Sequence, residues 1–329
     1  MRVLITGGAG FIGGHLAKRI LAEGIPVDLV DNFSRAVHDP FLDAIKQSKG
    51  VGLIERDLLQ PDALDSLDDS YTHIVHLAAI VGVKHVLERP YQVLRDNETM
   101  TFHAMDLAKR QKNLERFVFA STSEVVAGTL KHFGITIPTP ETTPLTIGDP
   151  GDVRTTYMLS KIYGEALCHH SGLPFTIVRP HNFYGPRMGL VHVIPQLAER
   201  AFKAQDGDEL EVYSPTHQRT FCYIDDAVEM IWRLMSRSEG EKGTFNIGAE
   251  SPELTMRQVA EKVVKVVGRD LTVTDGPVMH SSPERRAPDM SHTRKAADYD
   301  PQISLDEGVT RTVDWYRANV FENAGQSAV

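Results

Sequence analysis

The chain has 329 residues, 41% of them hydrophobic, which is long enough for one large domain or two closely joined ones with a sizeable core. Its formal net charge of -9 comes with no basic stripe, which argues against nucleic acid as a partner. Two cysteines are too few for a disulfide framework, and no apolar run approaches the ~20 residues of a membrane span, so we expect a cytoplasmic protein without membrane contact.

The first half of the sequence alternates short β-branched runs with longer amphipathic stretches, which is the rhythm of a parallel sheet covered by helices. Nearly continuous apolar runs predict strands that are buried on both faces. We predict such strands at 3–6, 27–31, 51–56, 73–78, 116–121 and 175–179. The predicted fold class is therefore α/β, with a Rossmann-type doubly wound parallel sheet.

The second half of the sequence is richer in glycine, proline and aromatic residues, and its predicted elements are shorter. Short strands are expected at 210–213, 220–224 and 245–248. Thr255 is a predicted N-cap for an amphipathic helix that ends at Gly268.

These elements predict two lobes. The first is a Rossmann domain at 1–180, to which residues 220–248 return. The second is a smaller C-terminal α/β substrate lobe formed by 181–219 and 249–318. The small polar end at 319–329 is expected to fray.

Glycines at three positions lie between the first predicted strand and the helix after it. Gly7 can form the tight turn, Gly10 lets the backbone approach a pyrophosphate, and Gly13 lets the helix pack against the strand. The amino end of that helix, with Phe11 and Ile12, would face the phosphates, because its backbone amides carry partial positive charge. This turn predicts a dinucleotide-binding site.

An acidic residue ends the second predicted strand. Asp31 follows Gly13 by 18 residues, a spacing at which its carboxylate can bind the ribose hydroxyls of adenosine and repel a 2′-phosphate. The sequence therefore favours NAD over NADP as the cofactor, and Arg35 nearby is the feature that argues the other way.

Four short motifs together resemble the extended short-chain dehydrogenase/reductases, in particular the nucleotide-sugar epimerase/dehydratase family. They are Gly-Gly-Ala-Gly-Phe-Ile-Gly at 7–13, Asp31-Asn32, Asp57-Leu58 and His76-Leu77-Ala78-Ala79. The resemblance covers most of the chain. It implies that Asp57 meets the adenine and that Ala78 and Ala79 pass beside the cofactor. Further cofactor contacts are implied for Asn32, Leu58, Leu77 and Asn97.

Tyr157 and Lys161 are four residues apart in a predicted helix, so their side chains lie on one face, one turn apart. A lysine ammonium and an oxidised nicotinamide would favour the phenolate and make the tyrosine a base for a sugar hydroxyl. The same spacing also arises by accident on amphipathic helices, so its position in the chain decides its meaning. The resemblance assigns both residues to catalysis and to cofactor binding.

Hydroxyl and carboxylate side chains follow the strand predicted at 116–121, at the edge of the sheet where open α/β proteins bind ligands. By resemblance Thr122 binds the hydroxyl that Tyr157 deprotonates, which makes it catalytic, and Ser123 contacts the substrate. Glu124 has two interpretations that the sequence leaves equal: a second acid or base for a ketone intermediate, or a cap of the local turn.

Asn182 and two arginines are the predicted substrate contacts. Asn182, in segment 179–186, resembles the family's asparagine that meets the substrate diphosphate, and Arg219 resembles its phosphate-binding arginine. Guanidinium geometry suits phosphate oxygens, although an arginine paired with a local carboxylate is the plainer alternative. Arg286 resembles a second such arginine, with Arg285 directly before it as an alternative.

Several histidines occur near one another, but none of these sets shows a mixed-ligand pattern, so no metal site is predicted. The sets are His73 with His76, His169 with His170, and His181 with His192. By resemblance, the helix predicted over 94–112 and the Tyr157 helix pair across a homodimer.

The resemblance implies NAD-dependent oxidation at C4 of a nucleotide-diphosphate sugar, and family members differ in the fate of the resulting ketone. C4 epimerisation ranks first, since Met158-Leu159-Ser160 between the catalytic residues is close to the epimerase form. A UDP-glucuronate decarboxylase ranks second, because Ala-Ser-Thr-Ser-Glu-Val and Tyr-Gly-Pro-Arg-Met resemble that group. Net oxidation at C4 ranks third.

Two further interpretations have less support from the sequence. A 4,6-dehydratase normally carries Thr-Asp-Glu, where this chain has Thr122-Ser123-Glu124, and the missing carboxylate argues against dehydration. A catalytically silent dinucleotide-binding relative would typically have lost the tyrosine or the lysine, and both Tyr157 and Lys161 are present.

Overall fold

The computed structural model describes residues 1–35, 39–279 and 283–322. Its centre is a seven-stranded sheet of parallel strands in the order β11-β6-β5-β4-β1-β2-β3. The strands are β1 Val3–Thr6, β2 Val27–Asp31, β3 Val51–Glu55, β4 His73–His76, β5 Arg116–Ala120, β6 Phe175–Pro180 and β11 Gly243–Ile247. From β1 the chain moves outward to β3 and then returns through β4 to the other side. This is the predicted doubly wound Rossmann fold.

Both faces of the sheet are covered, which explains the nearly continuous apolar runs. All residues of β1, β4 and β5 are buried. His76 lies inside β4 with its Nδ1 atom 2.8 Å from the Oγ1 atom of Thr6, and burial lowers the pKa of its imidazole to about 3. The imidazole is therefore neutral and belongs to the core of the sheet.

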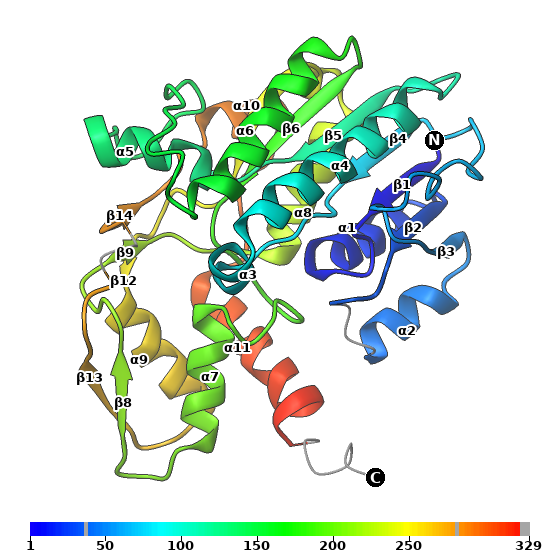
Figure 1. The fold of residues 1–329 in the computed structure, drawn as a ribbon. Coiled ribbons are helices and arrows are strands. Elements are labelled where there is room, and N and C mark those ends of the chain that lie inside the picture. Colours follow the sequence, from blue (N-terminus) through cyan, green and yellow to red (C-terminus); the bar gives the residue numbers. More distant parts are fainter. Residues whose placement is uncertain (36–38, 280–282, 323–329) are drawn as a thin grey trace.

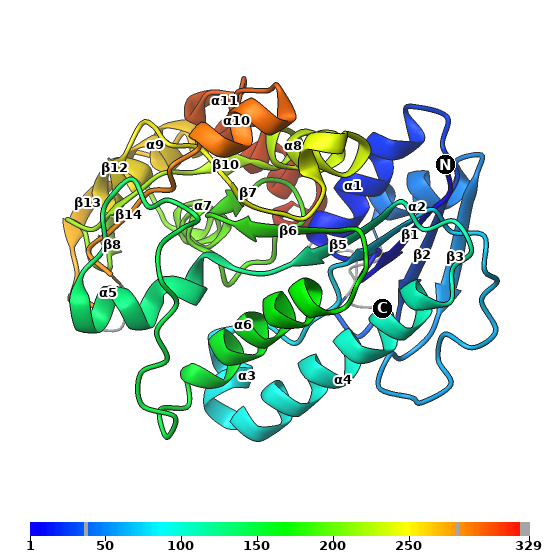
Figure 2. The ribbon, with the colours of Figure 1, turned by 90° about the horizontal axis from the view of Figure 1, so that it is seen from above.

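Helices form a layer on each face of the sheet (Figure 1, Figure 2). One layer contains α4 Pro90–Lys109 packed against α6 Thr155–His170, with α3 Val83–Glu88 beside α4. The other contains α1 Phe11–Leu21, α2 Pro40–Gln47, α8 Ile224–Ser236 and α10 Ser291–Ala297. Nowhere in the described ranges is there a helix with the length and apolar character to cross a membrane.

A smaller lobe lies beside one end of the sheet and is formed mainly by the last third of the chain (Figure 1). Its helices are α7 Val193–Lys203, α9 Met256–Val267 and α11 Leu305–Tyr316. Its strands are the pair β8 Glu209–Val212 and β13 Thr272–Asp275, and the trio β12 Leu254–Thr255, β9 Gln218–Arg219 and β14 Arg285–Arg286. Thr255 and Gln258 form a capping box at the start of α9, and Gly268 ends it at φ +80°, as predicted.

The chain crosses between the lobes more than once. α8 packs on α1 and β11 joins the sheet beside β6, so residues 224–247 belong to the larger lobe. The domain limits stay a proposal. A helical turn, Arg317–Phe321, continues into the segment expected to fray, and the Phe321 ring is tilted against that of Phe202, with ring centres 5.2 Å apart. Residues 323–329 of that segment lie outside the described residues.

Some observed boundaries differ from the predicted ones. The strand predicted at 220–224 is only β10 Cys222–Tyr223, which pairs with β7 Phe183–Tyr184, because α8 already begins at Ile224. Two aspartates in the first turn of α8 favour that early start. The helix predicted over 94–112 spans residues 90–109, since Pro90 suits a first helical position.

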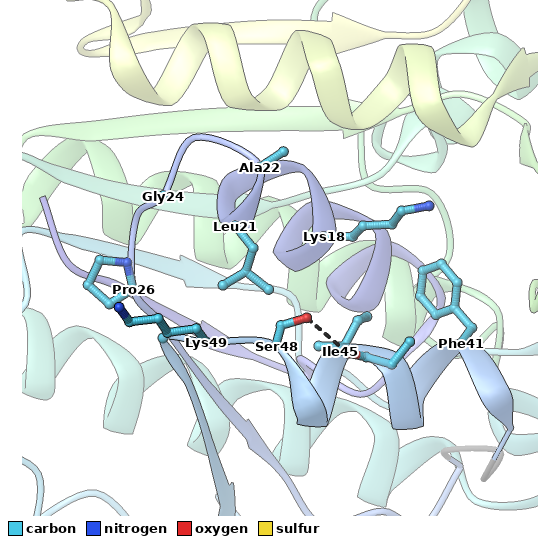
Figure 3. A pocket seen from close by; sticks show the side chains of 11 residues that line it. Lys18, Leu21, Ala22, Gly24, Pro26, Phe41, Ile45, Ser48 and Lys49 are labelled. Carbon is cyan, nitrogen blue, oxygen red and sulfur yellow. Dashed lines mark hydrogen bonds between the residues drawn. The ribbon is translucent and has the colours of Figure 1, made fainter.

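A groove of about 770 Å³ opens between α1 and α2, near the amino end of β2 (Figure 3). Leu21, Phe41 and Ile45 line it together with Lys18 and Lys49. No predicted site residue lines this groove. The predicted site lies at the opposite edge of the sheet, at the carboxyl ends of the strands.

Candidate active site

The glycine turn between β1 and α1 presents backbone atoms, not side chains, to a ligand. Its N-cap, Gly10, offers no side-chain hydrogen bond to the first turn of α1, so the amides there are open to a ligand. A Cβ atom on Gly7 would lie 2.9 Å from the Ala78 backbone nitrogen, and one on Gly13 would lie 2.4 Å from the Gly7 carbonyl oxygen. The turn thus has the close backbone approach that a pyrophosphate needs, with Phe11 and Ile12 at the helix end.

Asp31 connects the glycine turn to the loop after β2. Its Oδ2 accepts a hydrogen bond of 3.0 Å from the Ala9 amide, and its Oδ1 accepts one of 2.9 Å from the Phe33 amide. Each oxygen keeps a second lone pair, which is what ribose hydroxyls require. Asn32 beside it accepts hydrogen bonds from Ser34.

The loops after β3 and β4 complete this edge. The carboxylate of Asp57 accepts a hydrogen bond from the Leu59 amide, and Leu58 is buried. The amides of Leu77 and Ala78 donate to the backbone and side-chain oxygens of Thr6, which holds this segment along the glycine turn, and Ala79 follows it.

The amide of Asn97 on α4 holds the end of the same segment. Its Oδ1 accepts from the Ile80 amide at 2.7 Å, and its Nδ2 donates to the Ile80 carbonyl and to the Ser160 hydroxyl on α6. Asn97, a predicted cofactor contact, therefore joins the loop after β4 to helices α4 and α6 through hydrogen bonds. Its direct contact with a cofactor stays a prediction.

The sequence did not predict a buried ion pair that lies near the glycine turn. The Arg187 Nε donates to the Asp39 carboxylate at 2.6 Å, and its Nη2 donates to the Ala9 carbonyl at 3.2 Å. Asp39 also caps α2 by accepting from the Leu42 amide. One arginine thereby joins the glycine turn to the start of α2.

Tyr157 and Lys161 lie on one face of α6, as predicted, and Thr122 meets them at the end of β5. The Thr122 side chain hydrogen-bonds that of Tyr157. The Lys161 ammonium donates to the Ala120 carbonyl at 2.9 Å and lies 5.9 Å from the centre of the Tyr157 ring. The predicted triad is thus brought together.

The surroundings of the triad set the proton affinities of its members. Burial is the main cause that raises the pKa of Tyr157, and the Glu124 charge raises it further, while the Thr122 hydrogen bond opposes both. Burial lowers the pKa of Lys161 to about 8. The tyrosine therefore holds its proton firmly here, which differs from the lowered tyrosine pKa that the lysine alone would suggest.

Glu124 faces the open side of this group. It is exposed in the 3-10 turn Ser123–Val126, where Thr122 is the N-cap and accepts a hydrogen bond from the Glu124 amide. Thr122 is therefore the residue that caps the turn, and the Glu124 side chain takes no part in the cap. Ser123 is buried beneath the turn.

Arg219 and Arg286 are direct neighbours on the paired strands β9 and β14. Burial lowers the pKa of Arg219 to about 10, and the charge of Arg286 adds to this effect. Burial also lowers the pKa of Arg286, against the opposing charge of Glu124. Arg285, by contrast, is exposed and forms a two-point ion pair with Glu253. Arg219 is buried and Arg286 half-buried, and two like charges side by side are what an anion would stabilise, so their role in substrate binding stays a prediction.

Asn182 and His181 follow β6 between these two groups. Asn182 has a left-handed backbone (φ 44°), and its Nδ2 donates to the Thr220 carbonyl at 2.9 Å, next to Arg219. His181 is buried, with its Nε2 3.0 Å from the Asn246 Oδ1. Within the described ranges no cluster of three or more metal-ligating side chains is found.

A turn that can hold a dinucleotide, together with a half-buried tyrosine and a buried lysine one helical turn apart, is typical of the Rossmann enzymes that move a hydride and a proton at a substrate hydroxyl. The comparison with known sequences agrees. The model of the NAD dependent epimerase/dehydratase family matches residues 3–248, and the chain belongs to this family. The protein is an NAD-dependent enzyme of the nucleotide-sugar epimerase, decarboxylase and dehydratase group.

Two curated relatives and one solved structure illustrate the likeness. The UDP-N-acetyl-alpha-D-glucosaminuronate decarboxylase of Bacillus cytotoxicus is 32% identical, over 96% of this chain and 98% of that protein. UDP-glucuronic acid decarboxylase 2 of Arabidopsis thaliana is also 32% identical, over 100% of this chain and 71% of that protein. The Thermus thermophilus UDP-glucose 4-epimerase in complex with NAD is 27% identical and superimposes with a TM-score of 0.78, over 96% of this chain and 99% of that chain.

Proposed function

We propose that this protein is an NAD-dependent decarboxylase of a UDP-linked uronic acid that works through a ketone at C4 of the sugar. The observation that carries the proposal is Arg286, which lies opposite Arg219 on the paired strands β9 and β14 and feels the charge of Glu124. A uronic acid adds a carboxylate to the two phosphates, and a second arginine offers it a counter-charge. The decarboxylase names of both curated relatives support the same reaction.

In this proposal the reaction begins at the C4 hydroxyl. Tyr157 takes the hydroxyl proton, while Thr122, hydrogen-bonded to the tyrosine, binds the same oxygen. Bound NAD supplies the hydride acceptor, and its positive charge favours the phenolate. The Lys161 ammonium adds a second positive charge on the same face of α6.

The ketone at C4 turns the substrate into a β-keto acid. The bond between C5 and C6 breaks, its electron pair forms the C4–C5 double bond of an enolate, and the carboxyl carbon leaves as carbon dioxide. Tyr157, now protonated, and Thr122 donate hydrogen bonds to the enolate oxygen. The raised pKa of Tyr157 suits this step, because the tyrosine then holds its proton as a donor.

A proton must next reach C5. The hydride that bound NAD would have taken up in the first step would then return to C4, while the Tyr157 proton returns to the C4 oxygen. Glu124 is an exposed acid–base group whose charge acts on both Tyr157 and Arg286. We assign it the delivery of a solvent proton to C5.

C4 epimerisation is the second candidate. It is supported by Met158-Leu159-Ser160 between Tyr157 and Lys161 and by the epimerase of Thermus thermophilus. An epimerase turns the ketone over and needs little beyond Thr122, Tyr157 and Lys161. It leaves Glu124 without a task, and both curated relatives are named as decarboxylases, so decarboxylation comes first here, in the reverse of the order that the sequence alone favours.

The test is proton NMR of the purified protein in heavy water with UDP-glucuronic acid, UDP-N-acetylglucosaminuronic acid and UDP-glucose, each with and without added NAD. Decarboxylation predicts a product that has lost its carboxyl carbon and carries one deuterium at C5. An isomer without solvent deuterium would overturn the proposal in favour of epimerisation. Tyr157→Phe is expected to lower turnover at least ~100-fold while the bound NAD is retained.

A further inference from the structure

Glu98 lies one residue after Asn97 on α4, in the layer that packs against α6. The Asn97 amide donates to the Ser160 hydroxyl, and Ser160 directly precedes Lys161. This contact fixes the register between the two helices at the position where Glu98 and Lys161 occur.

One carboxylate oxygen of Glu98, Oε2, is closed off from solvent and has no hydrogen-bond partner among the described residues. Buried carboxylates are normally hydrogen-bonded or paired with a cation, because burial without a partner is unfavourable. The group that does act on Glu98 is Lys161: its charge opposes the effect of burial, which raises the pKa of the glutamate to about 7.

Lys161 is itself almost fully buried. Its ammonium meets the Ala120 carbonyl, lies 5.1 Å from the centre of the Phe119 ring, and lowers the pKa of His76. The charge that opposes burial at Lys161 comes from Glu98. The influence between the two groups is therefore mutual.

We propose that the Glu98 carboxylate is the counter-ion of the Lys161 ammonium, presented to it by the packing of α4 on α6. Glu98 then acts through Lys161, as a positioning residue that keeps the lysine charged beside Tyr157. The inference rests on the proposed catalytic roles of Tyr157 and Lys161.

Several other charged groups on the elements around α4 are paired or neutral, while Asp106 and Lys109 are exposed near the carboxyl end of that helix. On α4 itself, Arg95 pairs with Asp96, and on α3, Lys84 pairs with Glu88. On β4, burial lowers the pKa values of His73 and His76 to about 4 and about 3. On α6, Glu165 pairs with Arg179 and Tyr157 is hydrogen-bonded to Thr122, so neither of these groups neutralises the Glu98 charge.

The pairing has a consequence for pH. Lys161 loses its charge as the pH rises through about 8, and removal of the Glu98 charge moves that loss to lower pH. Below about pH 7 the wild-type glutamate is itself protonated, so an uncharged substitute changes little there. The expected signature of Glu98→Gln is a loss of activity confined to alkaline pH.

The decisive measurement is an NMR titration of ¹³Cε-labelled lysine in the NAD-loaded protein, with the Lys161 signal assigned by its absence in Lys161→Met. We expect Glu98→Gln to lower the pKa of Lys161 by about one unit. The matched control is Asp106→Asn, which removes an exposed carboxylate from the same helix and should leave that pKa unchanged. An equal Lys161 pKa in wild type and Glu98→Gln would overturn the proposal.

Two further measurements keep the inference separate from the proposed function and from folding. The rate profile with the substrate that proton NMR identifies should show kcat of Glu98→Gln reduced ~10-fold at pH 8.5, within ~2-fold of wild type at pH 6.5, and an unchanged KM. If no substrate is turned over, the proposed function fails while the lysine titration still decides the pairing. If Glu98→Gln does not fold, ¹³Cδ-glutamate titration of Lys161→Met takes its place: the pKa of Glu98 must rise, and an unchanged value refutes the pairing.

Discussion

Arg285 and Arg286 are consecutive residues with the same side chain and different surroundings. Arg285 is exposed and joined at two points to Glu253, and surface pairs of this kind contribute little to stability. Arg286 is half-buried, lies opposite Arg219 on the paired strand, feels the charge of Glu124, and forms no ion pair with any residue in the described ranges. A substrate anion would supply the counter-charge that Arg286 needs.

We therefore expect Arg286→Ala to raise KM for the nucleotide-sugar ~10- to 100-fold, the loss expected when one charged hydrogen-bond donor is removed. The matched control is Arg285→Ala, which should change KM less than ~2-fold. Steady-state kinetics on both variants makes the comparison. Equal effects of the two substitutions would contradict the assignment of Arg286 to the substrate.

At the scale of single residues, the sequence predicts best what is local. Tyr157 and Lys161 are one helical turn apart, so their meeting could be predicted from spacing. Glu98 could not be matched to Lys161, because only the packing of α4 on α6 brings them together. The same holds for Arg187 and Asp39, which are 148 residues apart in the chain.

At the scale of elements, the turn from β1 into α1 depends on the absence of side chains. A Cβ atom on Gly13 would lie 2.4 Å from the Gly7 carbonyl oxygen, and backbone there has no room to move aside. We expect Gly13→Ala to weaken NAD binding at least ~10-fold. The measurement is the amount of NAD released per chain when the purified protein is denatured.

The control for this turn is Gly151→Ala, in a surface turn where the nearest atom to a new Cβ is a carboxylate oxygen of Asp149 at 3.2 Å. It should carry as much NAD as the wild type. Full NAD occupancy in Gly13→Ala would show that the turn is not the pyrophosphate site. Circular dichroism of both variants separates a local effect from unfolding.

The order and type of the major elements could be predicted from the sequence, while some limits could not. Every strand predicted in the first half is present, and β1, β4 and β5 are fully buried as their continuous apolar runs indicate. The burial predicted for residues 51–56 is wrong, because β3 is an edge strand with no fully buried residue. The run at 220–224 has the same composition, yet most of it is not strand. Asp226 explains this, since its carboxylate accepts hydrogen bonds from Tyr299, Gln302 and Ile303, far along the chain, and fixes the start of α8.

At the scale of the whole molecule, the layer of α4 and α6 has an aromatic outer face. Tyr91 and Phe102 on α4 are 67% and 42% exposed, and Tyr163 on α6 is 43% exposed. The rings of Phe102 and Tyr163 meet edge to face, with centres 6.2 Å apart, across the seam between the helices. An apolar surface that spans two helices is typical of an interface between proteins.

We expect this face to pair with its copy in a homodimer, because a two-fold interface places the same two helices of each chain against each other. Light scattering after size-exclusion chromatography should give twice the 36.6 kDa mass of one chain. Phe102→Asp puts a charge into the centre of the face and should yield the monomer, since burying an unpaired carboxylate is unfavourable. Phe133→Asp, at a 77% exposed phenylalanine on α5 Ala127–Phe133, should leave the dimer intact. A monomeric wild-type protein would refute the homodimer. A dimer that survives Phe102→Asp but not Phe133→Asp would show that the interface does not involve α4 and α6.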